Sequence, residues 1–247
     1  MFVNNDINQT NLNKIQDDEM ALSEHIEEFS QRLIFCLILL VLSTLICFAD
    51  IKQIVQIFQI PAVGIKFLQF APGEYFFAFF KIAACSGILL SLSITIYQIF
   101  LYVVPGMTKK ERDIILPITF GSCILFAIGL IFAYFFLVPA ALKFFIAYGA
   151  EVVEPFWSFN QYFDFVAVLI FATGLAFQIP IIQVVLGLFG IVSGQTMLSA
   201  WKYIIVLSTI IAAIITPSTD PLTQIIMSVA LLTLYLGGAG FVILLKK

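Results

Sequence analysis

The chain has 247 residues, of which 62% are hydrophobic and only 11% charged, and its formal net charge is -3. This leaves too little polar surface to cover a water-soluble domain of that size, so composition excludes soluble enzymes and soluble binding modules. The apolar runs are long enough for spanning helices, and we predict an all-α integral membrane protein.

The chain divides into a polar tail and an apolar remainder. Residues 1–20 are rich in Asn, Gln and Asp and lack an apolar period, so we expect a mobile tail. Residues 21–247 are predicted to form a single six-helix membrane domain. The predicted spans are residues 33–49, 74–102, 114–146, 162–190, 201–215 and 222–245. The second and third spans exceed a bilayer core of ~30 Å and should tilt, whereas the fifth is short.

Two amphipathic stretches flank the first span. Leu22, Ile26, Phe29 and Leu33 recur at helical spacing among polar residues, which predicts a helix at the membrane interface running into the first span. Residues 51–59 repeat the pattern, so we expect a short helix reclining on the outer surface until Pro61. Residues 61–74, which contain two glycines and two prolines, are expected to be loop.

Pro139 lies late in the third span and is expected to kink it near the outer surface.

Charge in the middle of the chain is concentrated in residues 102–113, where Pro105 and Gly106 end one apolar run. Short basic loops mark the cytoplasmic or stromal side, and an even number of spans places both termini together, so we predict an N-in, C-in topology. The basic residues expected on that side are Lys14, Arg32, Lys109, Lys110, Arg112, Lys202, Lys246 and Lys247, against Lys52, Lys66 and Lys143 opposite.

Few polar residues lie inside the predicted spans. Lys81, about two turns into the second span, is expected to snorkel to the outer surface. Gln178 stands beside Pro180, which frees a backbone carbonyl, and it either meets a polar residue of a partner's helix or bonds within the bundle. His25 is the only histidine and the four cysteines lack metal-ligand spacing, so no metal site or cofactor is predicted.

Glu28 and Glu111 stand out because the topology brings both acids to the same membrane face. A carboxylate accepts a planar, two-pronged guanidinium in a way that a lysine ammonium cannot match. Arg32 and other basic residues nearby would keep the acids charged. These two acids could therefore bind a pair of adjacent arginines, although composition alone favours two solvated interfacial acids.

An ordered set of motifs resembles one family. The motifs are residues 25–32 (HIEEFSQR), 105–106 (PG), 110–112 (KER), 132–134 (FAY), 174–180 (GLAFQIP) and 216–224 (TPSTDPLTQ). Together they resemble the TatC family, the core receptor subunit of the twin-arginine protein translocase, from about residue 21 to the end of the chain. The resemblance is closest to cyanobacterial and plastid members. It implies a plastid thylakoid membrane, with a bacterial plasma or thylakoid membrane as the alternative.

The resemblance implies a non-enzymatic receptor with a concave bundle of helices. Such a receptor binds the Arg-Arg pair in signal peptides of folded precursors, recruits single-span TatA- and TatB-type partners and uses the proton-motive force. Self-association and lipid contact are implied, and nucleic acid is not a partner. Signal-peptide binding is implied for Glu28, Glu111, Tyr102, His25 and Arg32, and partner-helix contact for Gln178, Thr216 and Asp220.

Ala230 and Leu236 differ from bacterial members, and three further positions depart from the family pattern. Ser30 replaces the first arginine of the N-terminal motif, so an Arg–Glu pairing from that position is not expected. Tyr102 stands where many members have phenylalanine, and Gln178 where many bacterial members have an intramembrane glutamate.

Two other function classes are less consistent with the sequence. A secondary transporter of a small solute would need an ionisable cluster near the bilayer midplane, which the sequence does not supply. An intramembrane enzyme would need a nucleophile and base at suitable spacing, and none is apparent.

Overall fold

The computed structural model describes residues 22–62, 65–103, 109–149, 156–216 and 220–245. The side chains of residues 22–25, 100–101, 103, 109–116 and 149 are also outside the described part. The predicted tail, residues 1–20, and the loop at Pro105 and Gly106 therefore lie outside the described residues.

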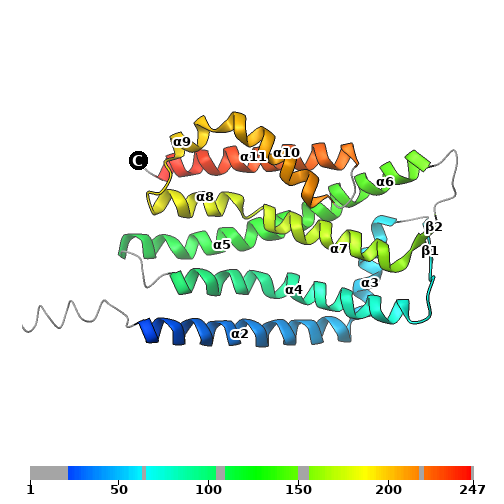
Figure 1. Cartoon of the computed structure of the whole chain (residues 1–247). Helices are drawn as coiled ribbons and strands as arrows, with labels where there is room; N and C mark the ends of the chain where they lie inside the picture. Colours follow the sequence, from blue (N-terminus) through cyan, green and yellow to red (C-terminus); the bar gives the residue numbers. More distant parts are fainter. Residues whose placement is uncertain (1–21, 63–64, 104–108, 150–155, 217–219, 246–247) are drawn as a thin grey trace, which may run out of the picture.

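Almost all of the described residues are helical, and the axes of most helices are roughly aligned with one another (Figure 1). The helices are α2 (Leu22–Ala49), α3 (Ile51–Gln59), α4 (Glu74–Val103), α5 (Lys109–Phe132), α6 (Val138–Gly149), α7 (Phe159–Ala176), α8 (Ile179–Leu188), α9 (Gly194–Ser199), α10 (Trp201–Ile215) and α11 (Pro221–Leu245). Two short strands, β1 (Lys66–Leu68) and β2 (Phe156–Ser158), pair in parallel.

Apolar length supports the predicted architecture. Five helical stretches of the described chain are long and apolar enough to cross a bilayer, and the 15-residue α10 is a shorter apolar helix. The prediction of an all-α protein with six apolar spans, including a short fifth, is confirmed. We call the end where α2 and α5 begin the inner end, and the end holding α3, β1 and β2 the outer end (Figure 1).

The first helix differs from its prediction. The amphipathic segment does not lie along the membrane interface as a separate helix. It continues into the first span as one 28-residue helix, α2, which runs alongside α4 (Figure 1). No glycine or proline interrupts residues 22–49, so the backbone has no reason to end or bend between the polar and apolar parts. Glu28 and Arg32 are therefore carried on the same helix as the span.

The short helix α3 is confirmed, but its apolar face packs on the bundle. Ile51 and Val55 are buried in the main hydrophobic core. Its last carbonyls accept hydroxyls from two distant helices: Tyr134 Oη donates to Ile57 O (2.7 Å) and Tyr162 Oη to Phe58 O (2.6 Å). These bonds satisfy carbonyls that the end of a helix leaves open.

The segment predicted as loop, residues 61–74, contains structure that the sequence did not indicate. A 3₁₀ turn (Ile60–Ala62) leads into β1, which pairs with β2 from a distant part of the chain. Beside the strands, Ser158 Oγ donates to Glu74 Oε1 (2.6 Å), and Glu74 Oε2 accepts from Phe70 N (2.7 Å). The outer ends of α4 and α7 are thus held together.

The third and fourth spans are interrupted at neighbouring positions. A π-helical turn, Ala133–Leu137, separates α5 from α6 immediately before Pro139, which has no N–H to donate to the carbonyl four residues earlier. Helix α6 runs at an angle to α5 (Figure 1), which agrees with the predicted kink near Pro139. A second break separates α7 from α8 at Phe177 and Gln178, and the Phe132 and Phe177 rings lie 5.5 Å apart between the two breaks.

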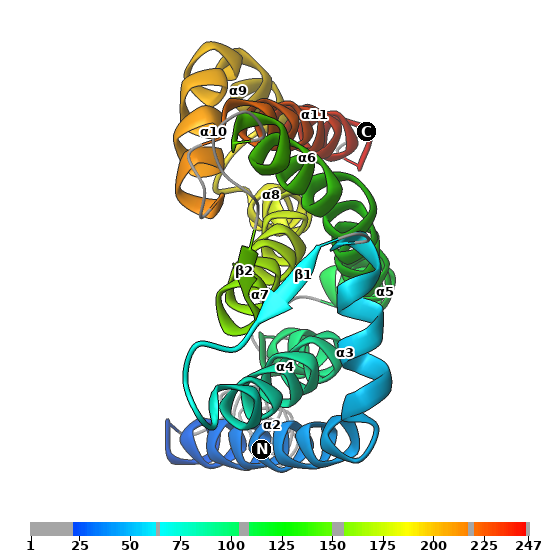
Figure 2. The ribbon, with the colours of Figure 1, turned by 90° about the vertical axis from the view of Figure 1, so that its right-hand side faces the viewer.

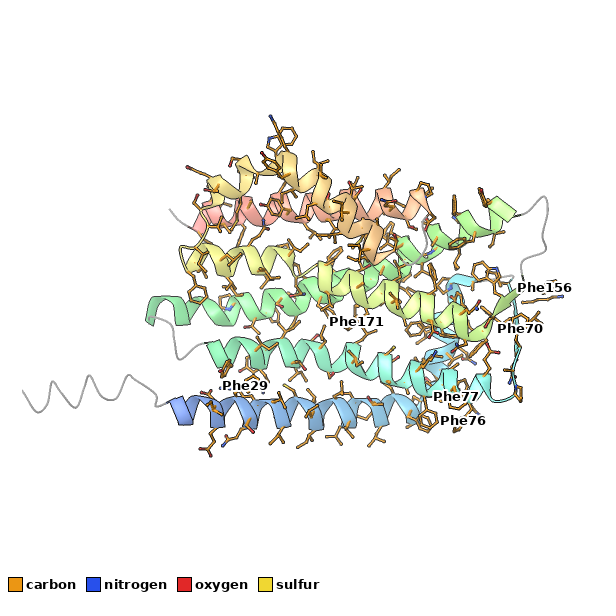
Figure 3. The ribbon with its side chains drawn as sticks, in the orientation of Figure 1. Phe29, Phe70, Phe76, Phe77, Phe156 and Phe171 are labelled. Carbon is orange, nitrogen blue, oxygen red and sulfur yellow. The ribbon has the colours of Figure 1, made fainter. Side chains whose placement is uncertain are left out.

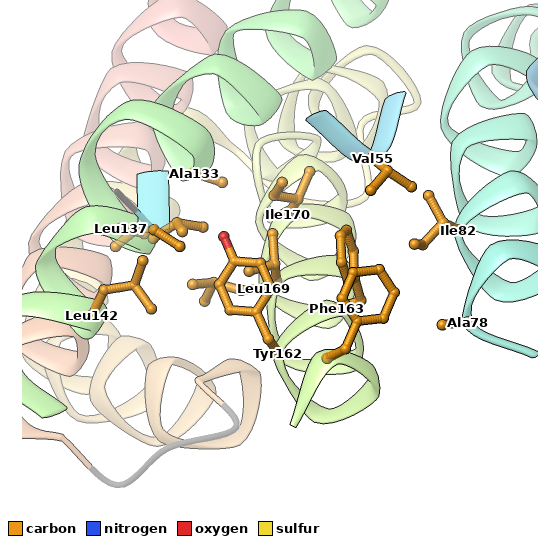
Figure 4. Close-up of a cluster of buried hydrophobic side chains, with 14 of the residues drawn as sticks. Val55, Ala78, Ile82, Ala133, Leu137, Leu142, Tyr162, Phe163, Leu169 and Ile170 are labelled. Carbon is orange, nitrogen blue, oxygen red and sulfur yellow. The ribbon is translucent and has the colours of Figure 1, made fainter. Parts of the chain in front are cut away.

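The helices form an arc, with α2 at one edge and α9–α11 at the other (Figure 2). Helix α7 lies centrally and contacts α4, α5 and α10. Its side chains dominate the core, where Tyr162, Phe163 and Leu169 pack towards Leu137 and Ile82 (Figure 4). The inner end of the arc carries the candidate site.

Candidate functional site

The structure brings two helices of the candidate site into direct contact at the inner end. Glu28 and Arg32 lie one turn apart on α2, and Tyr102 lies in the last turn of α4. Helices α2 and α4 pack along their length. The polar face of the amphipathic segment and the end of the second predicted span therefore form one surface.

Arg32 is the centre of this surface. Its Nε and Nη2 donate to Glu28 Oε1 at 2.9 and 2.5 Å, and its Nη1 donates to Gln98 Oε1 at 2.9 Å. The guanidinium thus links the first turns of α2 to the last turns of α4. Gln98 was not predicted as a site residue, although an amide in an apolar run, one turn before Tyr102, was a signal for it.

Only one of the two carboxylate oxygens of Glu28 is hydrogen-bonded to Arg32. Both hydrogen bonds from Arg32 fall on Oε1, and the side chain of Glu28 is 21% exposed. Oε2 is shielded from solvent and has no hydrogen-bond partner among the described residues. A shielded carboxylate oxygen without a donor is costly, and a cationic donor would relieve that cost.

An aromatic pair lies next to the charged cluster. The rings of Phe29 and Tyr102 are 5.4 Å apart between centroids and tilted by 58°. Phe29 is half exposed and lies on the side of α2 that faces α4 (Figure 3). The surface therefore offers an apolar contact beside a carboxylate.

Two predicted site residues are placed by their helices alone. Glu111 lies in the first turn of α5 and His25 in the first turn of α2, so both are at the inner end with Glu28. Their side chains lie outside the described part of the chain.

Gln178 bonds within the bundle. Ser122 Oγ donates to Gln178 Oε1 at 2.5 Å, and Gln178 Nε2 donates to the Ser122 carbonyl at 3.1 Å. Ser122 is fully buried on α5, whereas Gln178 is partly exposed. Of the two interpretations of this amide, the geometry supports bonding within the bundle.

Replacing Gln178 by Leu should therefore cost stability, because it leaves the buried Ser122 hydroxyl without this acceptor. We expect the double variant with Ser122→Ala to recover part of the loss, with a coupling energy of about 0.6–1.7 kcal/mol. Denaturation of the single and double variants in detergent measures it. Strictly additive losses would contradict the pairing.

The side chains of Thr216 and Asp220 are buried, so a partner helix cannot contact them in this structure. Thr216 is 4% exposed and donates to Ala212 O, and Asp220 is 1% exposed and accepts from Thr223 N at 2.9 Å. An acceptor at this position caps the first turn of α11. The geometry supports capping and turn formation for both residues, and partner contact is not supported by exposure.

Lys81, which was expected to snorkel to the outer surface, forms an ion pair with a neighbouring helix. Its Nζ lies 2.9 Å from Asp164 Oδ2 and 3.1 Å from Asn160 Oδ1, both on α7. The two charged side chains are about half exposed, at 51% and 48%. Sequence reasoning missed Asp164, because nothing local indicates which residue of another helix will face a lysine.

Metal ligands are not gathered in the part of the chain that the structure describes: no group of three or more His, Cys, Asp or Glu residues lies close enough to hold an ion. The four cysteines are free thiols. The ionic contacts recorded at the described side chains are interhelical or local pairs at the two ends of the bundle. A midplane ionisable cluster of the kind that a secondary transporter needs is not among them.

Comparison with known proteins agrees with the motifs. The family model for the Sec-independent protein translocase protein TatC matches residues 24–229. The tatC-like protein ycf43 of Porphyra purpurea is 56% identical over 100% of this chain and 97% of its own length. The TatC protein of Synechocystis is 50% identical, with 96% and 93% covered. The chloroplastic TATC protein of Pisum sativum is 48% identical, with 92% and 65% covered.

Solved structures agree with the fold. A crystal structure of a twin-arginine translocase receptor, TatC, superposes with a TM-score of 0.77 at 30% identity, covering 90% of this chain and 100% of that one. The chloroplast and cyanobacterial relatives, with the apolar helices, make the chain a multi-pass protein of a thylakoid or plastid membrane. From its motifs, its fold and these relatives, the chain belongs to the TatC family of Sec-independent protein translocase proteins.

Proposed function

We propose that this chain is the receptor subunit of a twin-arginine translocase and that it binds the Arg-Arg pair of precursor signal peptides at the inner end. Glu28 and Glu111 each take one guanidinium in this proposal. The acids start on different helices, α2 and α5, so two adjacent arginines can bridge them.

The observation that carries the proposal is the state of Glu28. Its carboxylate binds the Arg32 guanidinium through Oε1, and this geometry supports the proposal that it can bind a guanidinium of the signal peptide. Charge-assisted bonds between guanidinium and carboxylate have a planar geometry that an ammonium cannot reproduce. A receptor built on such bonds would prefer arginine over lysine.

The neighbouring residues fit the rest of such a ligand. Phe29 and Tyr102 present an aromatic surface where an apolar residue after the arginines can pack. In this proposal His25, which lies in the first turn of α2, contacts the polar flank of the peptide. In this proposal the chain performs no catalysis. It recruits single-span TatA- and TatB-type partners, and the proton-motive force drives transport.

Photo-crosslinking tests the location. A photoreactive amino acid at Gln31, exposed beside the cluster, should crosslink an Arg-Arg signal peptide. The same group at Phe156, exposed at the outer end, should not (Figure 3). Equal crosslinking at both positions, or crosslinking only at Phe156, would contradict the proposed site.

A further inference from the structure

We propose that Arg32 is an internal competitor for the signal peptide and that Gln98 is the positioning residue which sets the strength of that competition. The inference rests on the proposed function, because it concerns the same carboxylate. It adds a residue on α4 that determines how readily Glu28 accepts a second guanidinium.

The first step is the way Arg32 is held. Each of its three guanidinium nitrogens donates one hydrogen bond: Nε and Nη2 to Glu28, and Nη1 to Gln98. Glu28 lies on the same helix, whereas Gln98 lies on the neighbouring one. Gln98 therefore fixes the orientation of the guanidinium plane over Glu28.

The second step concerns the carboxylate oxygen of Glu28 that this orientation leaves without a hydrogen bond. With Nη1 held by Gln98, Arg32 reaches only Oε1 of the carboxylate. Oε2 is shielded and has no hydrogen-bond partner among the described residues. A carboxylate has acceptor sites on both oxygens, so Oε2 keeps acceptor capacity that Arg32 does not use, and a guanidinium that reached it would displace the groups that shield it.

The third step is what residue 98 can offer Arg32. A glutamine is neutral, so it accepts from Arg32 without drawing it away from the charged Glu28. A carboxylate at position 98 would compete with Glu28 for Arg32 and would free Glu28 for the peptide. An apolar residue there would let Arg32 pivot and cover both oxygens of Glu28, as a two-pronged pair.

The two changes should therefore act in opposite directions. Gln98→Glu should tighten binding of an Arg-Arg signal peptide, and Gln98→Met, of similar length, should weaken it, each by about tenfold, the value of one charge-assisted bond. The full chain in detergent micelles is titrated with a fluorescent peptide. Gln56→Glu, which adds the same charge on an exposed side chain of α3 at the outer end, is the matched control and should leave affinity within about twofold.

The outcomes separate this inference from the proposed function. If Glu28→Gln weakens binding but both Gln98 variants shift the affinity in the same direction, the competition is wrong and the receptor site stands. If Glu28→Gln has no effect, the proposed function itself is wrong. Should Gln98→Glu not fold, Gln98→Asn, too short to reach Arg32, must weaken binding as Gln98→Met does. Unchanged affinity in both neutral variants would overturn the inference.

Discussion

Glu28→Gln and Glu111→Gln should each weaken binding of an Arg-Arg signal peptide about tenfold or more. Each change removes one charge-assisted contact worth roughly 1.5–3 kcal/mol. The amide keeps the shape of the side chain, so protein yield and topology should be unaffected. Fluorescence anisotropy of a labelled peptide with the purified chain measures the affinity.

Glu27→Gln is the matched control for Glu28. Glu27 is an exposed acid on the same helix, next to Glu28 in sequence, and makes none of the ion pairs recorded for the described residues. Its loss removes the same formal charge and should change affinity by less than about twofold, since an exposed charge contributes little. Equal losses for Glu27 and Glu28 would reduce the site to a general electrostatic attraction.

Gly129→Val should cause a large loss of stability. Helices α5 and α7 cross where Gly129 meets Gly174, and a Cβ added at Gly129 would lie 3.1 Å from the Gly174 Cα and 2.9 Å from the Phe177 ring. A backbone atom cannot yield as a flexible side chain can, so the helices must separate. Overpacking of this kind costs about 1–3 kcal/mol, and separation of the backbones places valine at or above the upper value.

Thermal denaturation in detergent checks this expectation against Gly240→Val. Gly240 lies in α11, where an added Cβ meets nothing within 4 Å. Both changes alter helix propensity equally, so the difference in melting temperature isolates the crossing. If both variants melted together with the parent, the close approach of α5 and α7 would not contribute to stability.

Local patterns were enough to predict the spans. Apolar length predicted α4, α10 and α11, and the period of Ile51 and Val55 predicted α3 with its correct face. These features depend on residues within one or two turns, which a single sequence displays directly. The straight course of α2 does not follow from the change in polarity along it, because such a change does not determine the direction of the helix axis.

Pairings between distant segments could not be predicted. The β1–β2 pairing joins residues about 90 positions apart, and three-residue strands have no pattern of their own. Asp164 faces Lys81 and Gln98 faces Arg32 only because helix rotation places them so. The family motif indicated Glu28 and Arg32, but the second acceptor for Arg32 came from packing.

The roles of the buried polar residues could not be predicted from the sequence either. The sequence marks Thr216 and Asp220 as polar residues in an apolar setting, which is equally consistent with a partner surface and with helix capping. Their near-complete burial and their bonds within the chain distinguish the two. Gln178 is similar, because its serine partner lies 56 residues away in sequence.

The most direct test of the receptor assignment is a paired titration of the purified chain with two signal peptides that differ only in an Arg-Arg or a Lys-Lys pair. The account predicts that the Arg-Arg peptide binds at least about tenfold more tightly, because only guanidinium matches the carboxylate geometry. It also predicts that Glu28→Gln removes most of this preference. Equal affinity of the two peptides for the parent chain would contradict it.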